Sequence, residues 1–203
     1  MKIKICGMKE TGNIREVTAL SPGYMGFIFY PMSKRYVGAD FEMPEIPSSI
    51  KKVGVFVNDA MKNISLKVKK YKLDLIQLHG DESPEFCKRA GARAKVIKAF
   101  GVDGDFDFTV ISDYEECCDY FLFDSKTAEY GGSGKNFDAG LLKNYKSSKP
   151  FFISGGIGVE EVQRLKSQVS MAFAIDVNSK FEIEPGLKDM NKLKLLFDAL
   201  SGK

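Results

Sequence analysis

The segment Lys2-Ile3-Lys4-Ile5-Cys6-Gly7 shows the pattern that decides the fold of this chain. A short run with β-branched residues, which is typical of a strand, leads directly into a cysteine and a glycine. Similar β-branched or aromatic runs recur at intervals of roughly 20 to 25 residues, which is the strand-plus-helix period of an α/β barrel with short loops. We predict eight strands, at Lys2–Cys6, Tyr24–Phe29, Lys52–Val57, Leu73–Gln77, Ala94–Ala99, Tyr120–Phe123, Pro150–Ser154 and Met171–Val177.

Amphipathic stretches separate most of the predicted strands. One of them is Glu160–Gln168, around which Val162, Leu165 and Val169 recur at helical spacing. An open, doubly wound sheet also alternates strands with helices, so the strand count alone fits two architectures.

The residues that end the strands favour the barrel. In a barrel the carboxyl ends of all strands converge on one face, and catalytic residues lie there. Because chemically capable side chains follow nearly every strand, we predict a single-domain (β/α)8 TIM barrel of the α/β class over residues 1–203. The clusters are Cys6-Gly7, Pro31 to Arg35, Asn58-Asp59, His79-Gly80-Asp81, Asp124-Ser125-Lys126, Gly155-Gly156 and Asn178-Ser179.

Composition is that of a globular protein. The 203 residues are 44% hydrophobic and 28% charged, and this length favours one domain. The apolar runs fall short of the roughly 20 residues that a membrane span requires, and the N-terminus lacks the apolar core of a secretory signal. We therefore expect a cytoplasmic protein with no membrane partner. The net charge of +3 is spread along the chain, which does not favour nucleic acid as a partner.

The four cysteines are Cys6, Cys87, Cys117 and Cys118, and they lack the C-x-x-C spacing of many zinc sites. His79 is the only histidine, which leaves few further ligands for a metal. We expect free thiols and no metal site.

A phosphate site is predicted where the last two strands end. Gly155 and Gly156 follow the seventh run, and Asp176-Val177-Asn178-Ser179 closes the eighth. In many barrels these two loops hold a phosphate, because glycine lets backbone N–H groups approach the anion. The alternative for the glycine pair is a tight turn that needs positive φ.

Cys6 and Asp124 are candidate catalytic groups because each ends a predicted strand at the predicted mouth of the barrel, Cys6 directly before a glycine and Asp124 directly after an apolar run. Free cysteine often behaves as a small buried hydrophobe, which is the alternative for Cys6. A carboxylate in this position either takes part in chemistry or caps a helix.

Arg35 and His79 are candidate binding groups in the loops after the second and fourth predicted strands. A guanidinium at Arg35 suits a planar carboxylate, although a plain surface arginine fits equally. His79 is either an acid–base group or a hydrogen-bonded structural ring. The glycine-rich stretch Tyr130–Lys135 lacks the spacing of a nucleotide-binding loop, and we interpret it as a mobile loop that closes over substrate.

Taken in order, many segments of the chain resemble the phosphoribosylanthranilate isomerase family of tryptophan biosynthesis. Any one segment is weak, but the ordered set spans almost the whole chain. The matching segments are Lys4–Met8, Gly26–Phe29, Ser33–Val37, Val53–Asn58, Gln77–Glu82, Phe123–Lys126, Gly131–Asp138, Ile153–Ile157, Asp176–Ser179 and Glu184–Asp189.

The resemblance implies an Amadori rearrangement of N-(5-phosphoribosyl)anthranilate, a small-molecule substrate, without metal or cofactor. It implies that Asp124 is the general acid, which opens the furanose ring, and that Cys6 is the base, which removes the C2′ proton. It also implies that Arg35 binds the anthranilate carboxylate. The remaining substrate-binding residues that it implies are His79, Gly155, Gly156, Asp176, Asn178 and Ser179.

Two positions depart from the family pattern. Lys180 stands where many relatives have glycine, and Ala139 stands where tryptophan is common. The departure at Lys180 leaves the individual phosphate ligands open, although its ammonium group is suited to assist anion binding.

Two alternatives remain open at this point. One is the related isomerase of histidine biosynthesis, which uses an aspartate where this chain has Cys6. The other is a barrel that binds sugar phosphates without turning them over, which retention of Cys6 and Asp124 disfavours.

The sequence leaves the oligomeric state open between monomer and homodimer. Because a free thiol has a pKa of about 8.5, we also expect a local feature that favours the Cys6 thiolate.

Overall fold

The computed structural model describes residues 1–126, 137–168 and 171–201. The predicted substrate-covering loop at Tyr130–Lys135 lies outside these residues, as does Val169. Among the described residues, no helix is both long and apolar enough to cross a membrane.

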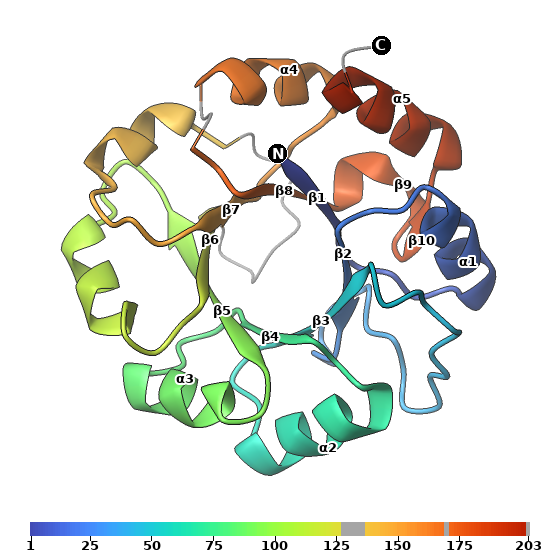
Figure 1. Ribbon diagram of the computed structural model, residues 1–203, viewed down its shortest axis with the longest axis horizontal. Helices are drawn as coiled ribbons and strands as arrows, with labels where there is room; N and C mark the ends of the chain where they lie inside the picture. The colour runs from blue at the N-terminus through green and yellow to red at the C-terminus, as the bar shows by residue number, and fades with distance from the viewer. Residues whose placement is uncertain (127–136, 169–170, 202–203) are drawn as a thin grey trace.

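Eight parallel strands form a closed barrel in chain order, and the last strand pairs with the first (Figure 1). Lys4 of the first strand lies opposite Asp176 of the last. The predicted closed barrel is therefore confirmed, and each predicted strand is present with shifted ends. The strands are β1 Lys2–Ile5, β2 Tyr24–Ile28, β3 Lys51–Phe56, β4 Leu75–Leu78, β5 Lys95–Val102, β6 Tyr120–Ser125, β7 Phe151–Ile153 and β8 Ala174–Val177.

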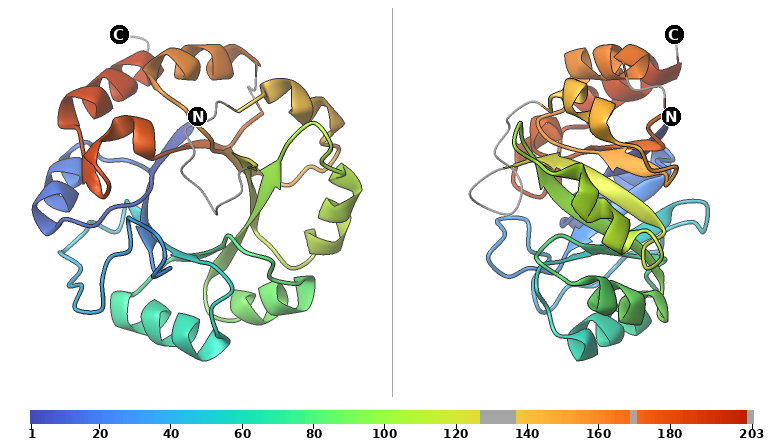
Figure 2. Two further views of the ribbon diagram at one scale, coloured as in Figure 1. Left: turned by 180° about the vertical axis from the view of Figure 1, so that it is seen from behind. Right: turned by 90° about the vertical axis from the view of Figure 1, so that its left-hand side faces the viewer.

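Helices surround the barrel, as both views down its axis show (Figures 1 and 2). The helix predicted at Glu160–Gln168 is present as α4, Val159–Gln168. Residues 29–50, between β2 and β3, contain no helix. The other α-helices are α1 Thr11–Ala19, α2 Met61–Tyr71, α3 Pro84–Gly91 and α5 Met190–Ser201, and the 3-10 helices are η1 Phe108–Tyr114, η2 Ala139–Asn144 and η3 Ser179–Phe181.

Helix α3 shows how local sequence sets the ends of an element. Pro84 occupies the first turn, where its missing N–H costs nothing, and Ser83 Oγ accepts a hydrogen bond from Phe86 N at 3.3 Å. Lys88 and Arg89 stand in the last turn, where cations are favourable.

Two apolar layers hold the barrel together. Alternate residues of the strands face outward against the helices, as Ile3 and Ile5 do in β1. The other residues face inward, where Tyr24, Leu122 and Phe152 belong to one buried cluster that fills the barrel. Polar side chains follow this cluster toward the carboxyl ends of the strands. The buried cluster therefore forms the floor of any site at that end of the barrel.

Candidate active site

One cavity opens at the carboxyl ends of the strands and encloses about 810 Å³, its open mouth included. This size is typical of small-molecule sites. All residues that the sequence proposed for catalysis or substrate binding line it, namely Cys6, Arg35, His79, Asp124, Gly155, Gly156, Asp176, Asn178 and Ser179.

Cys6 lies directly after β1, and its thiol shares a small space with the ammonium group of Lys4. Gly26 of β2 creates this space. A Cβ atom at Gly26 would lie 2.7 Å from Cys6 Sγ and 3.2 Å from Lys4 Nζ, so a larger residue would displace both groups. A glycine in the neighbouring strand thus allows a thiol and an ammonium group to stand side by side.

Lys4 and Asp176 form a buried ion pair at the edge of the cavity, where Asp176 belongs to the lining. Lys4 Nζ donates to both carboxylate oxygens of Asp176 at 2.9 Å, and the lysine side chain is fully buried. Burial by itself would lower the pKa of Lys4, but Asp176 and Cys6 outweigh it and raise that pKa. Lys4 therefore keeps its positive charge beside the thiol.

Burial raises the pKa of the Cys6 thiol, and the Asp176 carboxylate adds to the increase. Lys4 is the strongest of the groups that oppose it, and Lys188 contributes in the same direction. The feature that the sequence left unidentified is therefore Lys4. Its effect does not overcome burial, so Cys6 is a thiol in the resting site.

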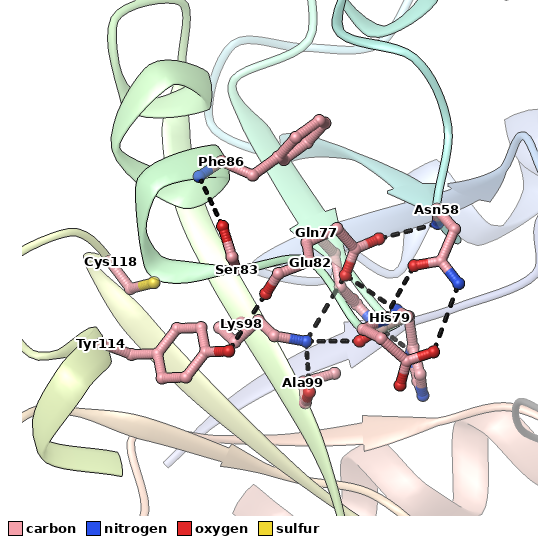
Figure 3. Close-up of polar contacts among 12 residues, drawn as sticks. Asn58, Gln77, His79, Glu82, Ser83, Phe86, Lys98, Ala99, Tyr114 and Cys118 are labelled. Carbon is pink, nitrogen blue, oxygen red and sulfur yellow. Dashed lines mark hydrogen bonds and ion pairs between the residues drawn. The ribbon is translucent and has the colours of Figure 1, made fainter. Parts of the chain in front are cut away.

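His79 and Asp124 meet on the opposite side of the cavity. Asp124 of β6 is buried, and its Oδ2 lies 3.5 Å from His79 Nε2. Gln77 Nε2 lies 2.8 Å from His79 Nδ1 and donates to it (Figure 3). This bond places the proton of a neutral ring on Nε2, the nitrogen that faces Asp124. Gln77 Oε1 is buried and, within the part of the chain that the structure describes, has no hydrogen-bond partner.

A second buried pair fixes the loop that carries His79 (Figure 3). Glu82 accepts hydrogen bonds from Asn58 N at 2.8 Å and Gly80 N at 2.9 Å. Lys98 Nζ donates to Gly80 O at 2.6 Å and lies 3.4 Å from Glu82 Oε2. These bonds hold the backbone after β4, so His79 projects from a rigid support.

Arg35 follows β2 and binds Glu182 at the rim of the cavity. Its Nε and Nη2 donate to the Glu182 carboxylate, with a shortest distance of 2.7 Å. Lys188 Nζ lies 2.7 Å from both Glu182 Oε1 and Asn178 Oδ1, while Asn13 pairs with the Lys188 backbone. The guanidinium is thus held in one orientation, and Nη1 is the nitrogen that these bonds do not use.

The end of the cavity formed by β7 and β8 has the geometry of an anion site. Gly155 and Gly156 both have positive φ, at 101° and 56°, and a Cβ at Gly155 would collide with Ser125. Both the conformation and the space therefore require glycine at that position. Lys180 lines the same cavity, so its departure from the family pattern adds a cation near this end.

Several site residues were not singled out from the sequence. Lys4 and Gln77 carried a readable signal, because each is a polar residue that interrupts an apolar strand at an inward-facing position. Lys188 lies in the matching segment Glu184–Asp189, which indicated the family but not a role in the site, and Glu182 carried no signal. They lie on a short hairpin, β9 Glu182–Glu184 and β10 Leu187–Lys188, whose position over α1 depends on tertiary contacts.

Comparison with known proteins adds a family assignment. The N-(5'-phosphoribosyl)anthranilate (PRA) isomerase family profile matches residues 3–199. The chain is similar to the N-(5'-phosphoribosyl)anthranilate isomerase of Parabacteroides distasonis, with 50% identity over 200 residues that cover 96% of this chain and 90% of that protein.

Solved structures of the same enzyme superpose along the whole chain. One is a phosphoribosyl anthranilate isomerase in complex with reduced 1-(o-carboxyphenylamino)-1-deoxyribulose 5-phosphate, with TM-score 0.82, 30% identity and full coverage of both chains. Another contains monomers of the dimeric enzyme from Thermotoga maritima, with TM-score 0.80, 28% identity and full coverage of both chains.

Proposed function

The chain belongs to the N-(5'-phosphoribosyl)anthranilate isomerase family, and we propose that Cys6 and Asp124 are the acid–base pair of its reaction. The protein is an isomerase of tryptophan biosynthesis. It converts N-(5'-phosphoribosyl)anthranilate to 1-(2-carboxyphenylamino)-1-deoxy-D-ribulose 5-phosphate. The observation that carries the assignment of roles is the position of the two groups, one directly after β1 and one on β6, in the lining of one cavity.

The first proton transfer opens the sugar ring. Asp124 donates a proton to the furanose ring oxygen, the C1′–O bond breaks, and the anilino nitrogen supplies its electron pair to form a protonated Schiff base. The Nε2–H of His79 faces the Asp124 carboxylate, so it orients the acid and stabilises the carboxylate that remains.

The second transfer removes the C2′ proton. The resting Cys6 thiol first releases its proton to solvent, and the thiolate then accepts the C2′ proton. The enolamine that results becomes the ketose when C1′ gains a proton and O2′ loses one. Asp124 regains its proton from solvent at the end of the cycle, so the protons balance over the sequence. Positioned acid–base groups of this kind each contribute on the order of 10² to 10⁴ in rate. The anilino nitrogen of the substrate supplies the electron pair that opens the ring and the other changes are proton transfers, so we propose a reaction without metal or cofactor.

The polar ends of the substrate match the two ends of the cavity. Arg35 takes the anthranilate carboxylate through Nη1, while Glu182 holds the guanidinium in place. The phosphate lies against Gly155, Gly156 and Ser179. Asn178 and Asp176 stay near the sugar, and Gln77 Oε1 accepts a hydrogen bond from a ribose hydroxyl, which supplies the partner that this buried oxygen lacks among the described residues.

The cellular setting follows from the biosynthetic role. We place the enzyme in the cytoplasm, as a monomer or homodimer, with a small molecule as its substrate. The dimeric relative from Thermotoga maritima supports the homodimer as one of these two states.

Substrate fluorescence tests the proposed roles directly. Freshly made phosphoribosylanthranilate loses its fluorescence signal on isomerisation, and the wild-type chain must exceed the spontaneous rate. Cys6→Ser and Asp124→Asn should each lower kcat by at least about a hundredfold. Cys117→Ser is the matched control because Cys117 does not line the cavity. Turnover near the wild-type value in either cavity variant would contradict its role, and turnover at the spontaneous rate by the wild type would favour a binding protein.

A further inference from the structure

Three of the four cysteines lie together on the outside of the barrel, away from the cavity. Cys87 belongs to α3, and Cys117 and Cys118 follow η1 just before β6. Their sulfur atoms all lie within 4.8 Å of one another, and the two neighbouring residues have sulfurs 3.9 Å apart. Figure 3 shows the side chain of Cys118 directed toward α3. Residues separated by 30 positions in the sequence thus meet as a cluster of three thiols.

We propose that Cys87, Cys117 and Cys118 form a trithiolate site for one thiophilic divalent cation of the Zn²⁺ class. Sulfurs in a tetrahedral zinc site lie about 3.8 Å apart, since each Zn–S bond is about 2.3 Å. The sulfurs therefore need to move by less than about 1 Å to bind such an ion. This inference is independent of the isomerase reaction, since none of the three residues lines the active-site cavity.

The donor set selects the kind of ion. Three sulfurs without a carboxylate favour soft metals over Mg²⁺ or Ca²⁺, which prefer oxygen ligands. Cys87 and Cys118 are buried, whereas Cys117 is partly exposed and leaves a path for the ion and for a water molecule as fourth ligand.

Charge around the cluster favours a divalent ion. Three thiolates with a divalent cation carry a net charge of −1, whereas a monovalent ion would leave −2 in a partly buried place. Lys149 acts electrostatically on Cys117, so positive charge is available beside the cluster for the single excess negative charge. Lys98 acts on Cys87 in the same direction, but Glu82, its ion-pair partner, acts on Cys87 in the opposite one. Lys149 also donates a hydrogen bond to Cys118 O at 2.6 Å, which fixes its position beside the cluster.

Hydrogen bonds link the three thiols to one another. A hydrogen bond from Cys118 lowers the pKa of Cys87, while the same bond and burial raise the pKa of Cys118. Burial also raises the pKa of Cys117, whose thiol donates to Tyr114 O at 3.4 Å. Binding of the ion by three thiolates releases the thiol protons to solvent, so the affinity must increase with pH.

Metal titration of the reduced full-length chain tests the site. We expect one Zn²⁺ per chain, measured by competition with a chromophoric chelator, and a Co²⁺ adduct with sulfur-to-metal charge-transfer absorption. Cys117→Ser should weaken binding at least about tenfold, because one of three ligands becomes a neutral hydroxyl. Cys6→Ala is the matched control and should bind as the wild type does.

A second variant separates loss of a ligand from loss of structure. Cys87→Ala removes a buried ligand, and isomerase turnover within twofold of wild type reports that the barrel is intact. Three results would overturn the proposal. They are no binding by the wild type at micromolar Zn²⁺, unchanged binding by the variant that combines Cys87→Ala with Cys117→Ser, and loss of binding in Cys6→Ala. Conversion of a pair of these thiols to a disulfide in the presence of the metal, seen by counting free thiols, would also overturn it.

Discussion

Replacing Lys4 with methionine removes the ammonium group that pairs with Asp176 and stands directly beside Cys6. Methionine keeps a long apolar side chain in the barrel, so the main change is the loss of the charge. The ammonium group stabilises the Cys6 thiolate, and without it the pKa of Cys6 rises further above its usual range. The catalytic base is therefore ionised less often at neutral pH.

The size of the effect follows from one charge-assisted hydrogen bond. Such a bond contributes roughly 1.5–3 kcal/mol, which corresponds to about one to two pKa units. We therefore expect kcat/KM at pH 7 to fall about 10- to 100-fold. Removing one partner of a buried pair also costs about 3–5 kcal/mol of stability unless the remaining acid is protonated. Burial already raises the pKa of Asp176, which reduces this cost.

The assay is kcat/KM as a function of pH, followed by substrate fluorescence. Activity rises as pH rises through the pKa of the base, so Lys4→Met should move this limb to higher pH. Asp176→Asn is the matched control with the opposite sign, because the Asp176 carboxylate raises the pKa of Cys6. It should move the limb to lower pH. A limb that stays in place in Lys4→Met, or that moves the same way in both variants, would refute the role assigned to Lys4.

Three further outcomes test the remaining parts of the site. Arg35→Ala should raise KM about 10- to 100-fold with little change in kcat, since a charged hydrogen bond is lost, and an unchanged KM would exclude the carboxylate clamp. Gly26→Ala should lower kcat at least about tenfold because its methyl group would lie 2.7 Å from Cys6 Sγ, whereas wild-type kcat would show that the thiol has room to move. Burial acts to raise the pKa of Glu182, but Arg35 and Lys188 outweigh it and lower that pKa. The carboxylate therefore stabilises the fold in full above about pH 4.5, the pKa of an unfolded glutamate, and this contribution is lost as pH falls through the lower pKa of Glu182 in the folded protein. Urea unfolding from pH 7 to pH 3 should therefore show a smaller loss of stability in Glu182→Gln than in the wild type, and equal losses would contradict this.

Sequence reasoning went furthest where periodicity and strand ends carry the information. The eight strands were placed because short β-branched and aromatic runs repeat at a fixed interval, and the barrel followed from the polar residues that end them. The strand ends were less accurate. β5 continues to Val102, since its pairing with β6 extends to Ser125. That length is set by the neighbouring strand, which a local pattern does not reveal.

The sequence by itself determined the barrel and the residues that line its mouth. Convergence at the carboxyl ends is a property of any parallel barrel, so Cys6 and Asp124 were bound to share a cavity once the strands were known. Only the tertiary structure decided the state of Cys6. Its ionisation depends on Lys4, on Asp176 from the far end of the chain, and on the space at Gly26. The tertiary structure also brings Cys87 together with Cys117 and Cys118. Electrostatic interactions and metal coordination depend on distances of a few ångströms between segments far apart in sequence, and those distances exist only after the chain has folded.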